Sequence, residues 1–148
     1  MINCKTENNS QTQSCGSLID ETLYENQLTD CIISSAIEVH KILGGPGLLE
    51  SIYEDALAHE LELRNITVKR QLSIPVFYKG VQVRDPLRLD LLVNDRIIIE
   101  VKSAEKNLEV HSSQVLTYLR LTQYKLGLVL NFGLPRLRDG ISRVVNNF

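Results

Sequence analysis

The sequence predicts an α/β (α+β) domain in which a mixed sheet is covered by helices on both faces. Apolar residues recur every three to four positions before residue 64 and again over residues 110–124, which is typical of amphipathic helices. Between these regions the period changes to two, as in strands. Residues 91–93 and 97–99 are apolar at every position, so both faces of those strands should be buried.

The two N-terminal helices are predicted over residues 30–43 and 47–64. Asp30 is suited to the N-cap of the first helix. The segment Gly44-Gly45-Pro46 should end it, because glycine fits the C-cap and proline cannot continue a helix.

The rest of the chain is predicted to run strand, strand, strand, helix, strand. Lys79-Gly80 marks a turn after the first strand, and Asn94-Asp95 is typical of a hairpin. The predicted segments are a strand over residues 72–78, a return strand that starts from residue 81 and includes 88–93, and a strand over 96–102. A helix over 110–124, a strand over 126–131, a loop over 133–140 and a short element over 141–145 follow.

Composition indicates one globular domain after a short tail. The chain has 148 residues, of which 43% are hydrophobic and 23% are charged, close to ordinary globular usage. Residues 1–17 are mostly polar and predict a flexible tail, which leaves residues 18–148 as a single domain. There is no apolar run long enough for a membrane helix and no signal-peptide core, and three cysteines argue against a disulfide framework. These features predict cytoplasmic location without membrane contact, and unpaired thiols.

Charge is spread unevenly along the chain. The formal net charge is −2, but residues 110–148 carry five basic side chains against one acidic side chain, which is 5 − 1 = +4. A mildly basic end could face a polyanion, but an ordinary solvated surface is the simpler interpretation.

Three charged residues stand where the predicted sheet should be dry: Asp90, Glu100 and Lys102. A buried charge is costly unless it is paired or bound to a metal. Two converging carboxylates form a hard oxygen site for Mg²⁺ or Mn²⁺, and an adjacent lysine could orient a metal-bound water. These are the parts of metal-assisted phosphodiester hydrolysis. The alternative is a structural ion pair between Lys102 and one of the carboxylates.

Four motifs in order give the chain a family resemblance. Residues 88–90 and 100–102, read as R-L-D and E-V-K, resemble the D…E-x-K core of the PD-(D/E)xK nuclease superfamily. Residues 47–53 spell G-x-x-E-x-x-Y, the signature of its GxxExxY family. Residues 114–118 resemble the Q-x-x-x-Y helix motif of related nucleases, and residues 131–133 with 135–137 resemble the family's C-terminal segment.

The resemblance implies a restriction-endonuclease-like α-β-β-β-α-β core and a one-metal or two-metal phosphodiesterase site, hence a hydrolase and endonuclease that uses Mg²⁺ (or Mn²⁺) and acts on DNA or RNA. By that resemblance Asp90 and Glu100 bind the metal with the Val101 carbonyl, and Lys102 positions the attacking water. Glu50 supplies an additional carboxylate ligand. The remaining two implied catalytic residues, Gln114 and Tyr118, steady the site or the phosphate.

A metal site also requires a particular register. With a plain two-residue loop at Asn94-Asp95, Asp90 would lie opposite Ile99 and point away from Glu100. The metal site therefore predicts a three-residue loop or a β-bulge near residues 94–96.

Helical spacing predicts which of the other carboxylates are buried and which are exposed. Glu50 and Glu54 are i, i+4 neighbours, and we expect Glu50 to be the more buried and Glu54 to be solvated. Glu60 either pairs with Arg64 or reaches the site. On the third helix His111 shares one polar stripe with Gln114 and Tyr118, which either covers the site or is a plain solvated face.

Three functional hypotheses follow. The first is a Mg²⁺- or Mn²⁺-dependent nuclease, favoured by the intact D…E-x-K set. The second is a non-catalytic module that retains the fold and binds nucleic acid or protein, favoured by the small size of the chain. The third is a subunit of a larger complex that docks through its acidic N-terminal segment. No recognition domain is evident, so a homodimer or a partner protein should supply recognition.

Overall fold

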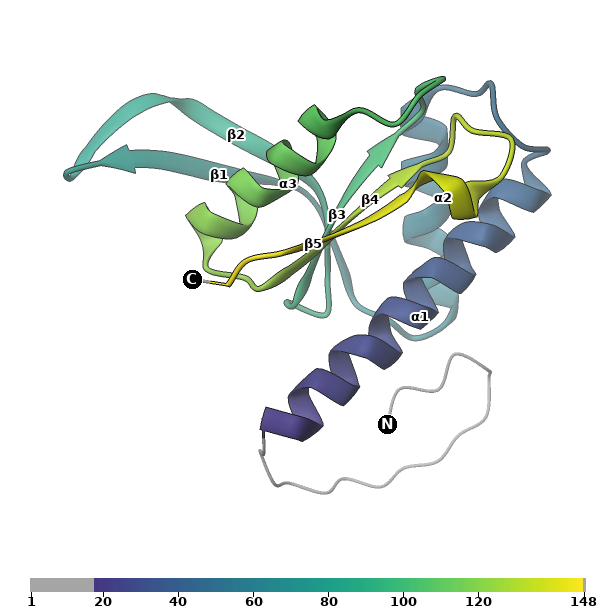
Figure 1. The fold of residues 1–148 in the computed structure, drawn as a ribbon, viewed down its shortest axis with the longest axis horizontal. Coiled ribbons are helices and arrows are strands. Elements are labelled where there is room, and N and C mark those ends of the chain that lie inside the picture. Colours follow the sequence, from purple (N-terminus) through teal and green to yellow (C-terminus); the bar gives the residue numbers. More distant parts are fainter. Residues whose placement is uncertain (1–17, 148) are drawn as a thin grey trace.

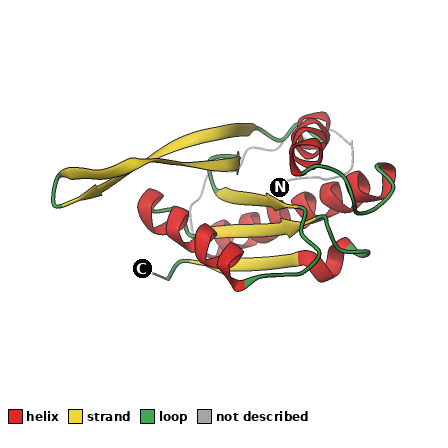
Figure 2. Ribbon diagram, turned by 90° about the horizontal axis from the view of Figure 1, so that it is seen from above, coloured by secondary structure: helices red, strands yellow, loops and turns green. Residues whose placement is uncertain are grey.

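The computed structural model describes residues 18–147, which fold into three layers (Figures 1 and 2). Two helices, α1 (Leu18–Ile42) and α2 (Glu50–Leu63), cover one face of a five-stranded sheet. Helix α3 (Glu109–Thr122) covers the other face. The predicted α+β class, with helices on both faces, is confirmed.

The sheet has strand order β1-β2-β3-β4-β5. Only β3 and β4 pair in parallel, because α3 crosses between them, and the other neighbours are antiparallel. The strands are β1 (Val68–Tyr78), β2 (Val81–Val93), β3 (Ile97–Lys102), β4 (Leu126–Asn131) and β5 (Ile141–Val145), with a short 3₁₀ helix η1 (Leu137–Gly140) before β5.

The central strands divide their side chains between two apolar clusters. Ile97, Ile99 and Val101 face α1 and α2, whereas Ile98 faces α3. All four side chains are fully buried, which explains the continuous apolar run in the sequence. Glu100 follows the alternation of Ile98 and therefore faces the α3 side.

Several predicted boundaries were wrong for local reasons. Helix α1 begins at Leu18, twelve residues before the predicted N-cap Asp30, which lies exposed inside the helix. Its first half buries Leu28 but leaves Leu23 55% exposed, so the apolar spacing there is weak. Helix α2 begins at Glu50 and not at Gly47, whose φ of +107° is incompatible with a helix.

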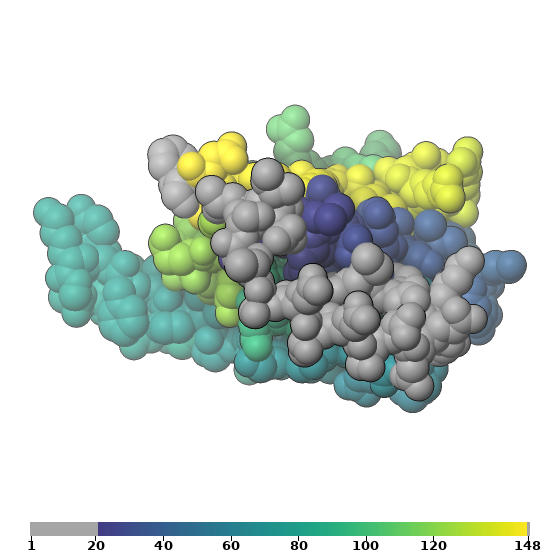
Figure 3. Space-filling view, turned by 90° about the horizontal axis from the view of Figure 1, so that it is seen from below, coloured from purple at the N-terminus to yellow at the C-terminus, as the bar shows by residue number. Residues whose placement is uncertain are grey.

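The lengths of strands β1 and β2 were also underestimated. The predicted pieces from residue 81 and over residues 88–93 form one continuous strand, and β1 starts at Val68. Both strands extend past the rest of the sheet as a hairpin arm, visible in teal in Figure 1 and in the space-filling view of Figure 3.

Two further expectations concern the ends and the cysteines. The predicted tail, residues 1–17, lies outside the described residues. Cys31 on α1 is 2% exposed and is disulfide-bonded, so the prediction of an unpaired thiol there was wrong. The chain's other two cysteines lie outside the described residues. Between residues 18 and 147, no helix is both long and apolar enough to cross a membrane.

Candidate functional site

The two candidate metal-binding carboxylates come from neighbouring strands. The β2–β3 hairpin closes with Val93 opposite Ile97, which leaves residues 94–96 as a three-residue loop. Continued by one residue, that register places Asp90 opposite Glu100, and cross-strand partners share a face, as the metal hypothesis required. Asn94 and Asp95 both have left-handed φ, a conformation that these two residue types tolerate better than most.

Strands β2 and β3 separate just where Asp90 lies. Leu91 is the last β2 residue in the regular pairing with β3. At the next residue, the Asp90 side chain replaces the backbone as hydrogen-bond acceptor: its Oδ2 accepts a hydrogen bond of 2.9 Å from the Val101 amide. The carboxylate thereby satisfies a β3 amide that has no partner in the β2–β3 pairing, and this hydrogen bond fixes the Asp90 side chain beside β3.

The alternation of β2 also breaks at this position. Leu89 packs on the α3 side, whereas Leu91 packs on the opposite side. On β1, the residue between the partners of Leu89 and Leu91 is Gln71, which has a φ of +52°. A left-handed glutamine in a strand is unusual and costs about 1–3 kcal/mol. The distortion therefore marks the point at which Asp90 is turned toward β3.

Glu100 is buried and only half satisfied. Glu100 is 3% exposed, and its Oε1 lies 3.1 Å from Lys102 Nζ. Its Oε2 is buried and has no hydrogen-bond partner among residues 18–147. A buried carboxylate oxygen without a partner is costly and needs an explanation, such as a cation that binds there.

Burial raises the pKa of both carboxyls. The pKa of Asp90 rises to about 6, because burial and the nearby charges of Glu54 and Glu50 outweigh the Val101 amide and Lys102. The pKa of Glu100 rises to about 7 through burial and the charge of Asp90, which Lys102 offsets only in part. The site thus holds more negative charge than its single lysine neutralises, which favours a bound cation.

Lys102 is held in its charged form. Burial lowers its pKa, but the charge and hydrogen bond of Glu100, with the charges of Glu50 and Asp90, leave the pKa above its ordinary value. The side chain is 18% exposed, so its ammonium reaches the surface of the site. A charged lysine donates hydrogen bonds and attracts negative charge, but it cannot act as a general base.

The expected contrast between Glu50 and Glu54 is reversed. Glu50, the first residue of α2, is exposed, although its charge acts on Asp90, Glu100 and Lys102. Glu54 is 7% exposed rather than solvated. Helical spacing located both on one flank of α2, but it could not show that β1 covers only the second of them.

The contacts that hold Glu54 were not predicted from the sequence. Its Oε2 accepts a hydrogen bond of 2.8 Å from Arg70, and its Oε1 accepts one from the side chain of Gln71. This network ties α2 to the distorted part of β1 beside Asp90. Glu60 lies apart from the site and pairs with Arg64 at 3.0 Å, one of the two alternatives expected for it.

Helix α3 is fastened to β2 two residues before Asp90. The Tyr118 hydroxyl donates to the Arg88 carbonyl at 2.9 Å and accepts from Gln114 Nε2 at 2.9 Å. Tyr118 is 3% exposed, so it is not part of a plain solvated face. His111 lies further along the same stripe. Burial and the charge of Lys102 lower its pKa, so it too lies within electrostatic reach of the site.

Tyr53 explains the glycine-to-tyrosine spacing before the site. Its hydroxyl donates to the Gly45 carbonyl at 2.7 Å and accepts from the Leu48 amide at 3.2 Å. Its ring stacks on Phe132 with centroids 4.7 Å apart. The tyrosine therefore fixes the glycine-rich turn from which α2 begins, and with it the position of Glu50.

The segment after β4 supports the end of β3. The Phe132 amide donates to the Lys102 carbonyl at 2.7 Å. Asn131 Oδ1 accepts from the amides of Ala104 and Gly133 at 2.9 and 3.0 Å. Gly133 has no room for a side chain, because a Cβ there would lie 2.3 Å from the Ala104 carbonyl oxygen. These contacts hold the chain that leaves Lys102.

The donor set fits a divalent cation in part. Asp90 and Glu100 converge, and the unpartnered Glu100 oxygen is a ready ligand. Within residues 18–147, no three histidine, cysteine, aspartate or glutamate side chains are grouped closely enough to hold a metal ion. A bound cation would therefore complete its coordination with a backbone carbonyl, water or substrate oxygens, as Mg²⁺ commonly does.

The comparison with known families now bears on this geometry. A family model described as the PD-(D/E)XK nuclease superfamily matches residues 26–144. The chain belongs to the PD-(D/E)XK nuclease superfamily. The matched range covers α2, α3 and strands β1 to β4 completely, and β5 except for its last residue, so the superfamily assignment applies to the sheet and to the helices on both of its faces. No curated protein and no solved structure matches the chain.

Proposed function

We propose that the protein is a metal-dependent nuclease whose site consists of Asp90, Glu100 and Lys102. Membership of the PD-(D/E)XK nuclease superfamily indicates metal-dependent nuclease activity and a nucleic-acid substrate. The observation that carries the proposal for these residues is the buried Glu100 carboxylate, whose Oε2 has no partner within residues 18–147. A purely structural ion pair with Lys102 would leave no reason to bury that second oxygen unpaired.

Asp90 and Glu100 would hold Mg²⁺ or Mn²⁺, with the Val101 carbonyl as a third protein ligand and Glu50 as an additional one. The cation would neutralise charge on the scissile phosphate and lower the pKa of a bound water. Glu50 is exposed at the start of α2, so it would reach the metal only through its flexible side chain or a water.

Lys102 contributes a positive charge at the edge of the site. Because its pKa is raised, the ammonium orients the attacking water through a hydrogen bond and stabilises negative charge on the phosphate. Gln114 and Tyr118 act as positioning residues, since their contacts hold the β2 backbone at Arg88 rather than reaching the carboxylates.

Finer features of the assignment rest mainly on the sequence. We place the protein in the GxxExxY family, because residues 47–53 carry its signature and Tyr53 organises the turn before Glu50. We propose an endonuclease in which a second copy or a partner protein supplies recognition. The disulfide at Cys31 removes the part of the argument for a cytoplasmic location that depended on unpaired thiols.

The test is cleavage of labelled single- and double-stranded DNA and RNA by the purified chain with Mg²⁺ or Mn²⁺. Lys102→Ala should abolish cleavage, whereas Lys125→Ala, a lysine outside the site, should leave it unchanged. Cleavage that survives Lys102→Ala would overturn the assigned site.

One observation favours a second candidate, a binding module that retains the fold without catalysis. Residues 18–147 contain no ready-made group of three metal-binding side chains. This candidate predicts nucleic-acid binding with no metal-dependent cleavage of any of the four substrates.

A further inference from the structure

The hairpin arm, defined here as residues 73–88, projects beyond the rest of the sheet (Figures 2 and 3). Its end carries a group of large apolar side chains that are more than half exposed. They are Phe77, Tyr78, Val81 and Val83, with exposed fractions of 58, 65, 62 and 54%. A two-stranded ribbon is only marginally stable by itself, and an exposed apolar group at its end marks an interaction site.

The arm presents one aromatic ring on each of its faces. Phe77 and Tyr78 are adjacent in β1, so their side chains point to opposite sides of the ribbon. Lys79 Nζ lies 5.5 Å from the centroid of the Tyr78 ring, which combines a flat apolar surface with a positive charge.

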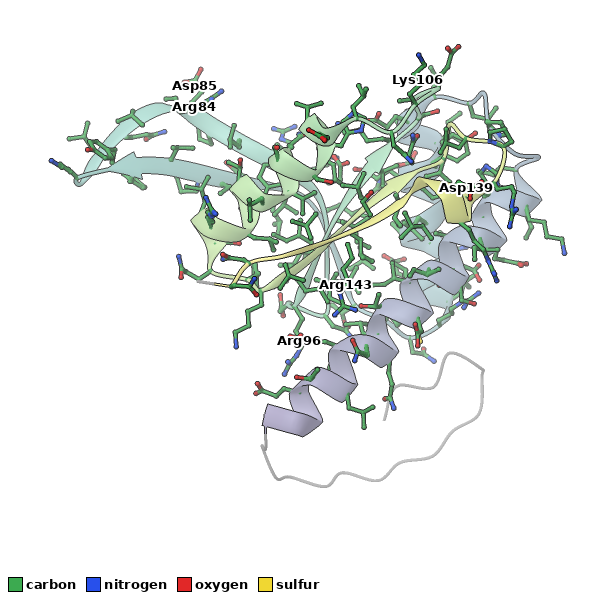
Figure 4. All side chains as sticks on the ribbon, viewed as in Figure 1. Arg84, Asp85, Arg96, Lys106, Asp139 and Arg143 are labelled. Atoms are coloured by element: carbon green, nitrogen blue, oxygen red, sulfur yellow. The ribbon has the colours of Figure 1, made fainter. Side chains whose placement is uncertain are left out.

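The arm is also basic within an acidic chain. It carries Lys79, Arg84 and Arg88 against Asp85, which is 3 − 1 = +2, whereas the whole chain has a net charge of −2. All four side chains are exposed. Figure 4 shows Arg84 and Asp85 on β2 of the arm, away from the helices.

The arm leads directly into the candidate site. Strand β2 runs from the end of the arm to Asp90, and the exposed Arg88 lies two residues before that carboxylate. The Tyr118 hydroxyl fixes the arm at its base through the Arg88 carbonyl. A ligand that lies along the arm would therefore be directed toward Asp90 and Glu100.

The β1 edge of the arm is poorly suited to pairing with another copy of the chain. Strand β1 is at the edge of the sheet, but Pro75 lacks an amide hydrogen, and the register shifts on both sides of Val76. Prolines and bulges on an edge strand prevent edge-to-edge pairing. The positive charge instead complements a polyanion.

We propose that residues 73–88 bind single-stranded or locally unpaired nucleic acid, with bases stacked on Phe77 and Tyr78 and phosphates on Lys79, Arg84 and Arg88. This proposal rests on the proposed nuclease function and names the substrate class that its site receives. Unpaired strands are favoured over a regular duplex, because only unpaired bases offer their flat faces to an aromatic ring.

The test measures binding of a fluorescent oligothymidylate and of a matched duplex by anisotropy, in EDTA so that no strand is cut. The double variant Phe77→Ala/Tyr78→Ala should weaken binding of the single strand by about tenfold or more. Ile42→Ala, which removes a 70% exposed side chain at the end of α1, is the matched control and should bind as the wild type.

A second measurement separates phosphate contacts from folding. Lys79→Gln/Arg84→Gln should reduce the slope of log affinity against log salt by roughly 1.4, since each phosphate contact to a single strand contributes about 0.7. Arg138→Gln, an exposed arginine of the basic C-terminal region, should leave the slope unchanged.

The outcomes distinguish this proposal from the proposed function. Unchanged affinity in the ring variant, tighter binding of the duplex than of the single strand, or a wild-type dimer that dissociates in the ring variant would each overturn the proposed role of the arm. If metal-dependent cleavage persisted in that case, the nuclease assignment would stand. Loss of binding in the ring variant, with no cleavage under any metal, would support the arm and overturn the nuclease assignment.

Discussion

Replacing Glu100 by glutamine separates a metal-binding carboxylate from a structural ion pair through opposite effects on stability. Folding raises the pKa of Glu100 from 4.5 to about 7, chiefly through burial. The folded protein therefore binds more protons than the unfolded chain between these pH values, and its stability falls as pH rises through that window. Above pH 7 the ionised carboxylate is a net cost to the metal-free protein.

The magnitude follows from the two pKa values. A difference of about 2.5 units, from 4.5 to about 7, corresponds to an upper bound of about 3 kcal/mol at pH 8. At pH 5 the same relation leaves a cost of less than about 1 kcal/mol. Glu100→Gln removes this cost while its amide oxygen still accepts a hydrogen bond from Lys102. The variant should therefore be about 1–3 kcal/mol more stable than the wild type at pH 8.

The assay is urea unfolding in EDTA, followed by far-ultraviolet circular dichroism at pH 5 and pH 8. Glu60→Gln is the matched control, because Glu60 also pairs with a basic side chain, Arg64, at 3.0 Å but lies away from the site. It should lose less than about 1 kcal/mol at both pH values. A Glu100→Gln variant that is less stable than the wild type at pH 8 would refute the reasoning and identify Glu100 as a structural partner of Lys102.

Three further predictions concern ligand binding and the supports of the site. Adding Mg²⁺ or Mn²⁺ at 100 times its Kd should stabilise the wild type in thermal unfolding by about 2.7 kcal/mol, and Glu100→Gln should respond far less; equal responses would place the metal elsewhere. Tyr118→Phe leaves the Arg88 carbonyl without its donor and should lose about 1–2 kcal/mol in urea unfolding, and an unchanged midpoint would show that the hydrogen bond does not form. Gly133→Ala should lower the melting temperature and reduce cleavage, because a Cβ there would overlap the Ala104 backbone; full activity would mean that the segment after Lys102 adapts.

The sequence predicted the layers and the order of elements because the signals were local. Continuous apolar runs such as residues 97–99 require cover on both faces, and the structure provides it. The requirement for a three-residue loop at residues 94–96 was also confirmed, since side-chain alternation fixes which register brings Asp90 and Glu100 to one face.

What the sequence did not reveal depends on contacts between distant segments. Glu54 was expected to be solvated, but Arg70 and Gln71 of β1 bury it, and no periodicity within α2 contains that information. The left-handed φ of Gln71 was equally unforeseen, because glutamine rarely adopts it. The continuity of β2 through residues 84–87 was missed because Arg84, Asp85 and Pro86 are exposed and do not show the apolar alternation that identifies a strand.

The central claim is that Asp90 and Glu100 form a cation site, and Mn²⁺ binding tests it most directly. Electron paramagnetic resonance of free Mn²⁺ during titration gives the affinity and stoichiometry without requiring a substrate. The account predicts that the wild type binds Mn²⁺ and that Asp90→Asn weakens binding by at least tenfold, while Asp139→Asn, on η1, has no effect. Equal Mn²⁺ binding by the wild type and Asp90→Asn would contradict it.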